Sequence, residues 1–366
     1  MISIAFTGGG TGGHIYPGLA LISYLQQHGG FRIFWIGSGT GMDRAIVEGA
    51  GIAFYGIPSG KLRRYFSFKN FADIFKVLAG FFAARRILKK EKPVLLFSKG
   101  GFVSVPPCAA AASLKIPVFS HESDSSPGLA TRINLRFSEK VFIPYKESAA
   151  LFPFSYRSRL QVSGNPIRPQ FRGADPAKGR AFLGLGAEDR ILLVLGGSQG
   201  AREINELVRE ALPDLVKIYA VVHQTGYYME WDEKPTAKYK PYRYIGEELP
   251  HVIAAAEIVL CRSGAGTVWE CASLQKPMIL IPLSGSGTRG DQVENAEIFE
   301  RMGAALVFRP GQANRQGLTE AAAALAGDRE KRQAMIAASS RLASSDAASL
   351  IAASIADRAG QILVIS

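Results

Sequence analysis

Three glycine-rich segments of the 366-residue chain each follow a short apolar run and precede a stretch with helical spacing. They read Thr-Gly-Gly-Gly-Thr-Gly-Gly-His over 7–14, Gly-Gly-Ser-Gln-Gly-Ala over 196–201 and Cys-Arg-Ser-Gly-Ala-Gly-Thr over 261–267. Glycines let the backbone approach a ligand closely, and the following helix N-terminus offers unpaired N–H groups and a positive dipole end. Because open α/β sheets bind ligands at the carboxyl ends of their strands, the three loops predict a phosphate-bearing ligand held between two domains.

The first loop also satisfies a dinucleotide-binding fingerprint, with glycines at Gly8, Gly10 and Gly13. That fingerprint requires an acid at the tip of the second strand, where it binds a ribose. Here the second strand ends at residues 35–38 without an acid, and Asp43 comes too late. The sequence therefore disfavours a Rossmann dehydrogenase.

The chain has no Asp-x-Asp pair and no His/Cys/carboxylate cluster with metal-ligand spacing. A bound pyrophosphate would then be neutralised by helix dipoles and arginines, so we expect neither a metal nor a cofactor. Cys108, Cys261 and Cys271 are scattered along the chain, which is typical of apolar core residues in a reducing compartment.

Short apolar runs bounded by Gly or Pro alternate with longer segments of helical spacing, which predicts the α/β class with parallel, doubly wound sheets. Prolines and glycine at 164–169 interrupt any regular element and mark a hinge between two domains. The Ala/Ser-rich stretch 337–360 is expected to be helical. We expect strands at 2–6, 32–36, 94–98, 118–120, 140–143, 191–195, 219–222, 258–261 and 278–281, and crossover helices at 19–27, 71–90, 201–212 and 293–302.

The net charge of +12 is concentrated between residues 61 and 92, which contain ten Lys/Arg and two acids. An aromatic stripe at helical spacing accompanies this charge. Two interpretations of the aromatic stripe have equal weight. It covers the sheet, as any crossover helix does, or it docks onto an anionic membrane surface. Nucleic acid is disfavoured, because a basic groove with base-stacking aromatics is absent. The candidate membrane or acceptor residues are Phe66, Phe68, Lys69, Phe71, Phe75, Lys76 and Phe82.

Several motifs occur in one order along the chain: residues 9–14, His-Glu at 121–122, Gly-Asn-Pro-Ile-Arg at 164–168, 196–201, 261–265 and Gln292 with Asn295-Ala296. Together they resemble the MurG family of GT-B glycosyltransferases, whose members transfer N-acetylglucosamine from UDP-N-acetylglucosamine to undecaprenyl-linked muramoyl-pentapeptide. The resemblance covers residues 1 to about 345. It implies two Rossmann-like domains with a cleft between them, and a peripheral protein on the cytoplasmic face of the bacterial inner membrane.

By this resemblance, residues 1–164 and a C-terminal helix at about 345–366 form an acceptor- and membrane-facing domain, and 165–344 form the donor domain. The resemblance implies that the Ile245 backbone meets the uracil and that Glu270 binds both ribose hydroxyls. Ser198 and Thr267 are expected to hold the phosphates and Gln292 to recognise the sugar. The other candidate donor-binding residues are Thr11, Gly12, Gly13, Asp124, Arg168, Arg262, Ala265, Gly266, Val268 and Trp269.

His14 is the first candidate for the catalytic base, because a helix N-terminus disfavours the cationic imidazole. Its alternative role is to orient the acceptor pyrophosphate. Glu122 is the rival base. The commonest family motif reads His-Glu-Gln-Asn, whereas this chain has Ser123 and Asp124, which replaces an amide donor with a charged acceptor. Similarly, Asp291 stands where many relatives place glutamine or histidine.

The resemblance implies an inverting, metal-independent hexosyltransferase that acts on the C4 hydroxyl of the lipid-linked acceptor, in peptidoglycan precursor synthesis. The nearest alternatives are a GT-B enzyme with another lipid acceptor and a UDP-sugar epimerase of the same fold. A membrane-recruited nucleotide-sugar sensor is the non-enzymatic alternative, in which His14 and Glu122 would be dispensable. The oligomeric state is open.

Overall fold

The computed structural model describes residues 1–27, 29–60, 69–197, 199–227, 230–285, 290–343 and 346–365, with the side chains of 69–72 and 361–365 excepted. The described chain forms two compact units. Unit 1 comprises Met1–Pro169 and Ser345–Ser366, and unit 2 comprises Gln170–Ser344. The chain passes from unit 1 to unit 2 at the end of the proline-containing segment 164–169.

Unit 1 is a parallel sheet with the strand order β3-β2-β1-β4-β5-β6-β7. Alternate residues of β1 face two different apolar clusters, Ile4 and Phe6 on one side and Ala5 on the other, as expected for a strand buried on both faces. The strands are β1 (Ile2–Thr7), β2 (Phe31–Ser38), β3 (Ala53–Ile57), β4 (Leu95–Ser98), β5 (Val118–His121), β6 (Lys140–Ile143) and β7 (Leu160–Val162). The helices are α1 (Tyr16–Gln27), α2 (Asp43–Gly49), α3 (Lys69–Glu91), α4 (Val105–Ser113), α5 (Leu129–Asn134) and α13 (Ala347–Ile365).

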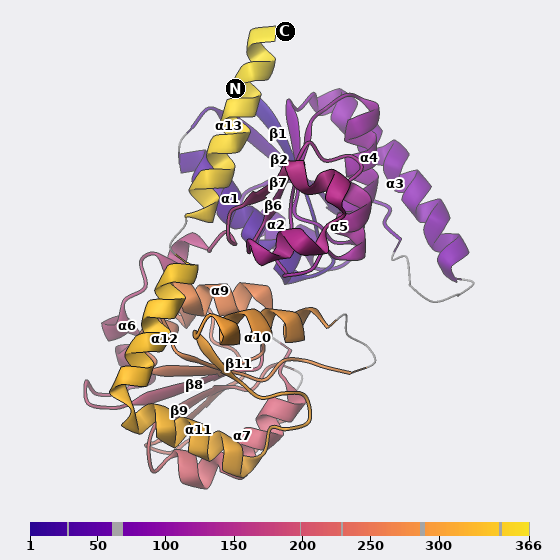
Figure 1. Cartoon of the computed structure of the whole chain (residues 1–366). Helices are drawn as coiled ribbons and strands as arrows, with labels where there is room; N and C mark the ends of the chain where they lie inside the picture. The colour runs from indigo at the N-terminus through magenta and orange to yellow at the C-terminus, as the bar shows by residue number, and fades with distance from the viewer. Residues whose placement is uncertain are drawn as a thin grey trace. The chain divides into compact units, whose positions relative to one another are not determined.

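Unit 2 is a second parallel sheet, with the order β10-β9-β8-β11-β12-β13 (Figure 1). Its central strand β8 is fully buried, so its residues can be continuously apolar. The strands are β8 (Ile191–Leu195), β9 (Ala220–Gln224), β10 (Tyr239–Tyr242), β11 (Ile258–Cys261), β12 (Met278–Leu280) and β13 (Ala305–Val307). The helices are α6 (Pro176–Leu183), α7 (Arg202–Leu215), α8 (Leu249–Ala255), α9 (Ala265–Ser273), α10 (Asp291–Arg301), α11 (Arg315–Gly327) and α12 (Arg329–Leu342).

The helical stretch expected at 337–360 is divided between two helices: α12 ends at Leu342 in unit 2, and α13 begins at Ala347 in unit 1, close to the start of the C-terminal helix expected at about 345–366. Asp346 Oδ1 accepts a hydrogen bond from the Ser349 N–H at 3.2 Å, as a residue that caps a new helix does. The helix α13 lies beside α1 (Figure 1), where the Tyr24 hydroxyl donates to Ser349 Oγ at 2.9 Å.

All nine expected strands are present, with ends within two residues of the expectation, but four further strands were missed. The missed strands are β3, β7, β10 and β13, which lie at or next to the edges of the two sheets. Edge strands are less buried and need less continuous apolar sequence, so their hydrophobic pattern is weak. The strand β10, for example, carries Lys240 and Pro241.

Candidate active site

The first glycine-rich loop leaves β1, forms a short 3-10 turn at Gly12–His14 and then enters α1. Asp43, buried at the start of α2, accepts hydrogen bonds from the Gly10 N–H at 3.0 Å and the Ser38 N–H at 3.1 Å. A Cβ at Gly9 would lie 2.0 Å from an Asp43 carboxylate oxygen. The acid that comes too late to bind a ribose therefore fixes the shape of the loop, a role that the sequence analysis missed.

His14 lies against the backbone that follows β4. Its Nδ1 is 2.8 Å from Thr11 Oγ1, so the tautomer of the imidazole is coupled to the direction of this hydrogen bond. Gly101 has φ +79°, and a Cβ there would lie 3.4 Å from His14 Cγ and 2.4 Å from the Gly9 carbonyl oxygen. Glycine at 101 is thus required by its positive φ and by the Gly9 carbonyl, whereas a Cβ would only be in ordinary contact with the imidazole.

Glu122 is 6% exposed, and both of its carboxylate oxygens accept hydrogen bonds from its own loop. The donors are the N–H groups of Ser123, Asp124 and Gly128, and the Thr131 hydroxyl at 2.6 Å. The hydrogen bonds of Glu122 stabilise the conformation of the 122–128 loop. Because both carboxylate oxygens already accept hydrogen bonds, His14 is favoured over Glu122 as the base.

Replacing Glu122 with glutamine is therefore expected to lower the free energy of unfolding and to have little effect on kcat. The new NH₂ group would face donors, which leaves buried N–H groups unpaired and costs about 2 kcal/mol of unfolding free energy. Urea unfolding measures that cost, and kcat measured well below the melting temperature is expected to stay within about tenfold of the parent. A loss of kcat with unchanged unfolding would instead assign Glu122 the base.

The Gly-Asn-Pro-Ile-Arg segment at 164–168 is hydrogen-bonded to residues 121–123, next to Glu122. The Asn165 amide donates to the Ser123 carbonyl at 3.0 Å, and His121 Nε2 is 3.0 Å from the Gly164 carbonyl. Burial, and then the nearby Lys99, lower the pKa of His121, so the ring is neutral and donates to that carbonyl. Arg168 stacks on the Tyr16 ring, 5.4 Å from its centroid. The segment thus places a guanidinium beside the start of α1.

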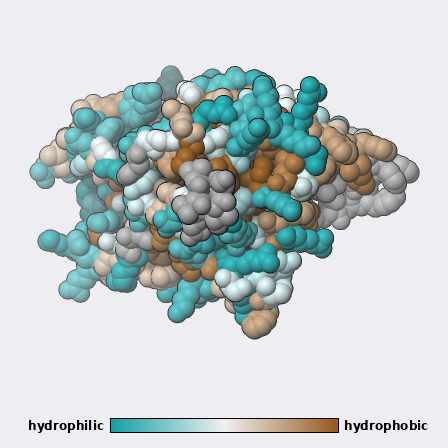
Figure 2. All heavy atoms as spheres, turned by 90° about the horizontal axis from the view of Figure 1, so that it is seen from above, coloured by the Kyte–Doolittle hydropathy of each residue, from teal (hydrophilic) through white to brown (hydrophobic). Residues whose placement is uncertain are grey.

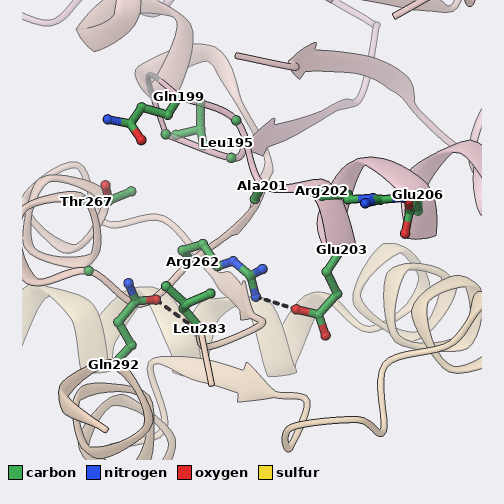
Figure 3. A pocket seen from close by; sticks show the side chains of 14 residues that line it. Leu195, Gln199, Ala201, Arg202, Glu203, Glu206, Arg262, Thr267, Leu283 and Gln292 are labelled. Atoms are coloured by element: carbon green, nitrogen blue, oxygen red, sulfur yellow. Dashed lines mark hydrogen bonds and ion pairs between the residues drawn. The ribbon is translucent and has the colours of Figure 1, made fainter. Parts of the chain in front are cut away.

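Unit 2 contains a pocket of about 700 Å³ (Figure 3). The second and third glycine-rich loops both line it, together with the start of α7. Of the sequence-predicted residues, Arg262, Thr267 and Gln292 line this pocket, whereas Ser198 lies outside the described residues. Its other lining residues are Leu195, Gly196, Gly197, Gln199, Gly200, Ala201, Arg202, Glu203, Glu206, Gly264 and Leu283.

The helix α9 begins directly after Gly264, which adopts an extended backbone at the cap. The first-turn residues Ala265, Gly266 and Thr267 carry N–H groups that have no partner within an α-helix, as a phosphate site requires. Val268 and Trp269 are different: their side chains are buried in the core. A contact of these two residues with a donor would therefore have to be made by their backbone. Glu270 is half-buried on the same helix.

Gln224 connects the second glycine-rich loop to the predicted uracil site, and sequence reasoning missed it. Its Nε2 donates to the Gly197 carbonyl at 3.2 Å, and its Oε1 accepts from the Ile245 N–H at 2.9 Å. The Ile245 N–H is therefore occupied, and the residue is fully buried. Gln292 is also positioned, because its Oε1 accepts from the Leu283 N–H at 3.0 Å.

The pocket arginines are each paired with a glutamate of α7. Arg262 Nη1 lies 2.7 Å from Glu203 Oε2, drawn as a dashed line in Figure 3, and it also donates to the Ile281 carbonyl. Arg202 is paired with Glu206 at 2.7 Å. Arg262, which is expected to neutralise a leaving diphosphate, is therefore already paired with a carboxylate. A bound phosphate would have to share the Arg262 guanidinium with Glu203.

Replacing Glu203 with glutamine is expected to tighten UDP binding about fivefold, because the guanidinium loses a competing anion and the pocket loses a negative charge. Isothermal titration with UDP measures the change. A matched control is Glu300→Gln, which breaks the pair with Arg309 outside this pocket. Unchanged or weaker UDP binding in Glu203→Gln would show that Arg262 does not contact the phosphates.

Two domain models of one family match the chain. The glycosyltransferase family 28 N-terminal domain matches residues 4–143, and the family 28 C-terminal domain matches residues 191–351. A UDP-N-acetylglucosamine–N-acetylmuramyl-(pentapeptide) pyrophosphoryl-undecaprenol N-acetylglucosamine transferase from Treponema denticola is 50% identical over 329 residues, with 84% of each chain covered. The chain belongs to glycosyltransferase family 28. A second transferase of the same name, from Bacillus cereus, is 43% identical and covers 90% of this chain and 93% of its own.

Solved structures show the same fold as this family 28 chain. MurG from Acinetobacter baumannii has a TM-score of 0.75 at 24% identity, with 98% of this chain and all of that chain covered. A UDP-GlcNAc 2-epimerase from Neisseria meningitidis has a TM-score of 0.68 at 13% identity, with 98% and 100% covered. Both likenesses confirm the GT-B fold expected from the sequence. They do not separate a transferase from an epimerase, which the sequence relatives do.

Proposed function

We propose that this chain transfers N-acetylglucosamine from UDP-N-acetylglucosamine to the C4 hydroxyl of lipid-linked muramoyl-pentapeptide, with inversion at the anomeric carbon. The observation that carries the proposal is the 43–50% identity, over most of the chain, to transferases named for this donor and acceptor. The glycine-rich pocket of unit 2 supports a diphosphate donor independently of those names.

On the donor side, the N–H groups of residues 265–267 and of the second glycine-rich loop would bind the diphosphate, with Thr267 and Ser198 adding hydroxyls. Ile245 would meet the uracil through its backbone, and Glu270 would accept hydrogen bonds from the ribose. Gln292, held by the Leu283 N–H, would recognise the sugar. These assignments need no metal, because amides and arginines supply the positive charge.

On the acceptor side, His14 would take the proton from the C4 hydroxyl as that oxygen attacks the anomeric carbon. The bond between the anomeric carbon and the phosphate oxygen breaks in the same step, and its electron pair leaves with UDP. Thr11, Gly12 and Gly13 would offer backbone N–H groups to the acceptor or donor phosphates, while the Thr11 hydroxyl is paired with His14. Most of the rate enhancement would come from positioning the substrates and from stabilising charge on the departing UDP.

The helix α3 supports the further proposal of an anionic membrane surface as partner. Ala84 and Leu88 of this helix pack in the core. Phe75 and Phe82 do not share this role, because they are 70% and 66% exposed. Lys76 is exposed on the same helix. At the right edge of Figure 2, hydrophobic and hydrophilic residues interleave next to the grey residues. Phe66 and Phe68 lie outside the described residues, as do the side chains of Lys69 and Phe71.

No helix in the described part of the chain is long and apolar enough to cross a membrane. Insertion of exposed aromatics beside lysines at a headgroup surface is the mode of binding that α3 supports. We therefore propose peripheral attachment at the cytoplasmic face of the inner membrane, where the lipid-linked acceptor would be reached.

The reaction is tested by UDP release from UDP-N-acetylglucosamine with and without the lipid-linked muramoyl-pentapeptide. UDP-N-acetylgalactosamine serves as the control donor. Release that depends on the acceptor and occurs with the first donor only is expected. Donor binding without acceptor-dependent release would overturn the proposed acceptor.

Membrane binding is tested by flotation with phosphatidylglycerol vesicles and with neutral phosphatidylcholine vesicles. The double variant Phe75→Ser, Phe82→Ser is expected to lose about tenfold in partitioning into the anionic vesicles, because two exposed apolar side chains no longer insert. Phe154→Ser is the matched control, since Phe154 is 84% exposed elsewhere in unit 1. Equal loss in the two variants would contradict a docking role for α3.

A further inference from the structure

Gln224 is the last residue of β9, and it stands between the segments that follow the two neighbouring strands. In the strand order β10-β9-β8, Gln224 is in register with Leu195, the last residue of β8, and with Tyr242, the last residue of β10. The second glycine-rich loop follows β8, and Ile245 follows β10. Because neighbouring parallel strands end at the same edge of a sheet, one side chain at this position can reach both segments.

The hydrogen bonds of Gln224 specify one orientation of its amide. The Ile245 N–H is a donor and faces Oε1 at 2.9 Å, whereas the Gly197 carbonyl is an acceptor and faces Nε2 at 3.2 Å. A flipped amide would place donor against donor and acceptor against acceptor. Gln224 is 3% exposed, so the loss of either partner would leave a buried polar group unpaired.

The two backbone segments depend on Gln224 to different degrees. Ile245 is fully buried, so its side chain holds it in the core. Gly197 has φ +81° and no side chain, and a Cβ there would meet nothing within 4 Å. Its carbonyl accepts hydrogen bonds from Gln224 Nε2 and from the Gly200 N–H, the latter at 3.2 Å. The turn that begins at Gly197 is therefore held by hydrogen bonds rather than by packing.

This turn shapes the phosphate end of the unit 2 pocket. Gly197, Gly200 and the first residues of α7 line the pocket. The N–H groups of a first helical turn converge on an anion only when the preceding turn keeps its shape. Gln224 thus acts on the pocket through Gly197.

The backbone around Gln224 is fixed without its side chain. The Thr225 N–H donates to the Tyr242 carbonyl at 2.8 Å, and the Asn205 amide of α7 donates to the Thr225 carbonyl at 2.9 Å. Asn205 Oδ1 is in turn 3.1 Å from Nε2 of the buried His223. Replacing the Gln224 side chain is therefore expected to leave β9 and α7 in place, so its effect reports the two amide contacts.

We propose that Gln224 is a positioning residue of the donor site, whose amide joins the second glycine-rich loop to the backbone at Ile245 so that the base and the diphosphate of one nucleotide are bound together. The inference rests on the proposed function for the identity of the donor as a uridine nucleotide. Since Gly197 depends on the amide more than the core-packed Ile245 does, loss of Gln224 weakens diphosphate binding more than base binding.

The test compares the dissociation constants of UDP and of uridine, which lacks the diphosphate, on the full-length protein. Gln224→Glu keeps an acceptor for the Ile245 N–H but places a carboxylate oxygen against the Gly197 carbonyl. It is expected to weaken UDP binding about 30-fold and uridine binding less than about threefold. Gln224→Met adds no charge and removes both hydrogen bonds, so losses of about tenfold for UDP and about threefold for uridine are expected.

The ratio of the two dissociation constants is a readout that a packing defect would not move, because a packing defect weakens both ligands alike. The KM for UDP-N-acetylglucosamine is expected to rise with the UDP dissociation constant, while the KM for the lipid-linked acceptor stays within about twofold. Gln316→Met is the matched control, since Gln316 is an exposed glutamine of α11 that donates to Glu320. Parental values of both constants are expected for it.

A parental ratio of the UDP and uridine dissociation constants in both Gln224 variants would overturn the inference, whether binding is unchanged or equally weakened. Should Gln224→Met fail to fold, the ratio in Gln224→Glu decides. An unmodified enzyme that binds UDP without acceptor-dependent release would mean that the proposed function has failed, and the ratio would still decide the inference. Acceptor-dependent release together with a parental ratio in the variants would mean that only this inference has failed.

Discussion

Replacing His14 with alanine is expected to lower kcat by roughly 10³-fold, within the range that removal of a general base produces. The imidazole is held 2.8 Å from Thr11 Oγ1 and packs on a glycine backbone that admits no side chain. No other residue is expected to take its place, since the oxygens of Glu122 are used by its loop. Steady-state UDP release with lipid-linked acceptor measures the loss.

Thr11→Val is the matched variant for His14, because it keeps the imidazole and removes its hydrogen-bond partner. An intermediate loss of about tenfold is expected, through the imidazole's orientation alone. The affinity for UDP should change little in either variant, since the pocket of unit 2 contains neither residue. Parental turnover in His14→Ala would rule out this histidine as the base.

Replacing Gly226 with alanine is expected to weaken donor binding by about 10²-fold or more. Gly226 has φ +97°, and a Cβ there would lie 2.2 Å from the backbone N and Cα of Gly200. The second glycine-rich loop must then move, and its N–H groups no longer converge on a diphosphate. Titration with UDP measures the effect, and the KM for UDP-N-acetylglucosamine is expected to rise with it.

Gly327→Ala is the control for this substitution. Gly327 ends α11 in the same unit, and a Cβ there would meet nothing within 4 Å. Parental UDP affinity is expected, with a slightly higher melting temperature from the better helix former. If Gly226→Ala also bound UDP normally, the conformation of the 196–201 loop would be irrelevant to the donor.

The alternation of apolar runs with helical segments was sufficient to predict the two parallel sheets, and two of the three glycine-rich loops line the pocket of unit 2. Such loops carry their own physical reason, because only glycine permits the backbone to turn and approach a ligand there. Edge strands such as β10 gave no comparable signal. Composition gave no signal for the break between α12 and α13, because Ala and Ser occur on both sides of it.

The residues that support the site were harder to predict than those at its surface. Asp43, Gln224 and Glu203 act through contacts with residues that are distant in sequence, 21 to 59 positions away. Nothing in their local sequence distinguishes an acid that shapes a loop from an acid in solvent. The burial of Val268 and Trp269 was equally hard to predict, since proximity to a motif does not reveal which side of a helix faces the core.

The return of α13 to unit 1 has a consequence for synthesis on the ribosome. Ile351 and Ile355 are fully buried in the cluster that contains Leu21 and Leu25 of α1. These partners emerge before unit 2, whose residues Gln170–Ser344 number 175. At about 5–20 residues per second, translation of that stretch takes roughly 9–35 s. During this interval the nascent unit 1 exposes an apolar face of α1, which makes it a client for chaperones until its final helix arrives.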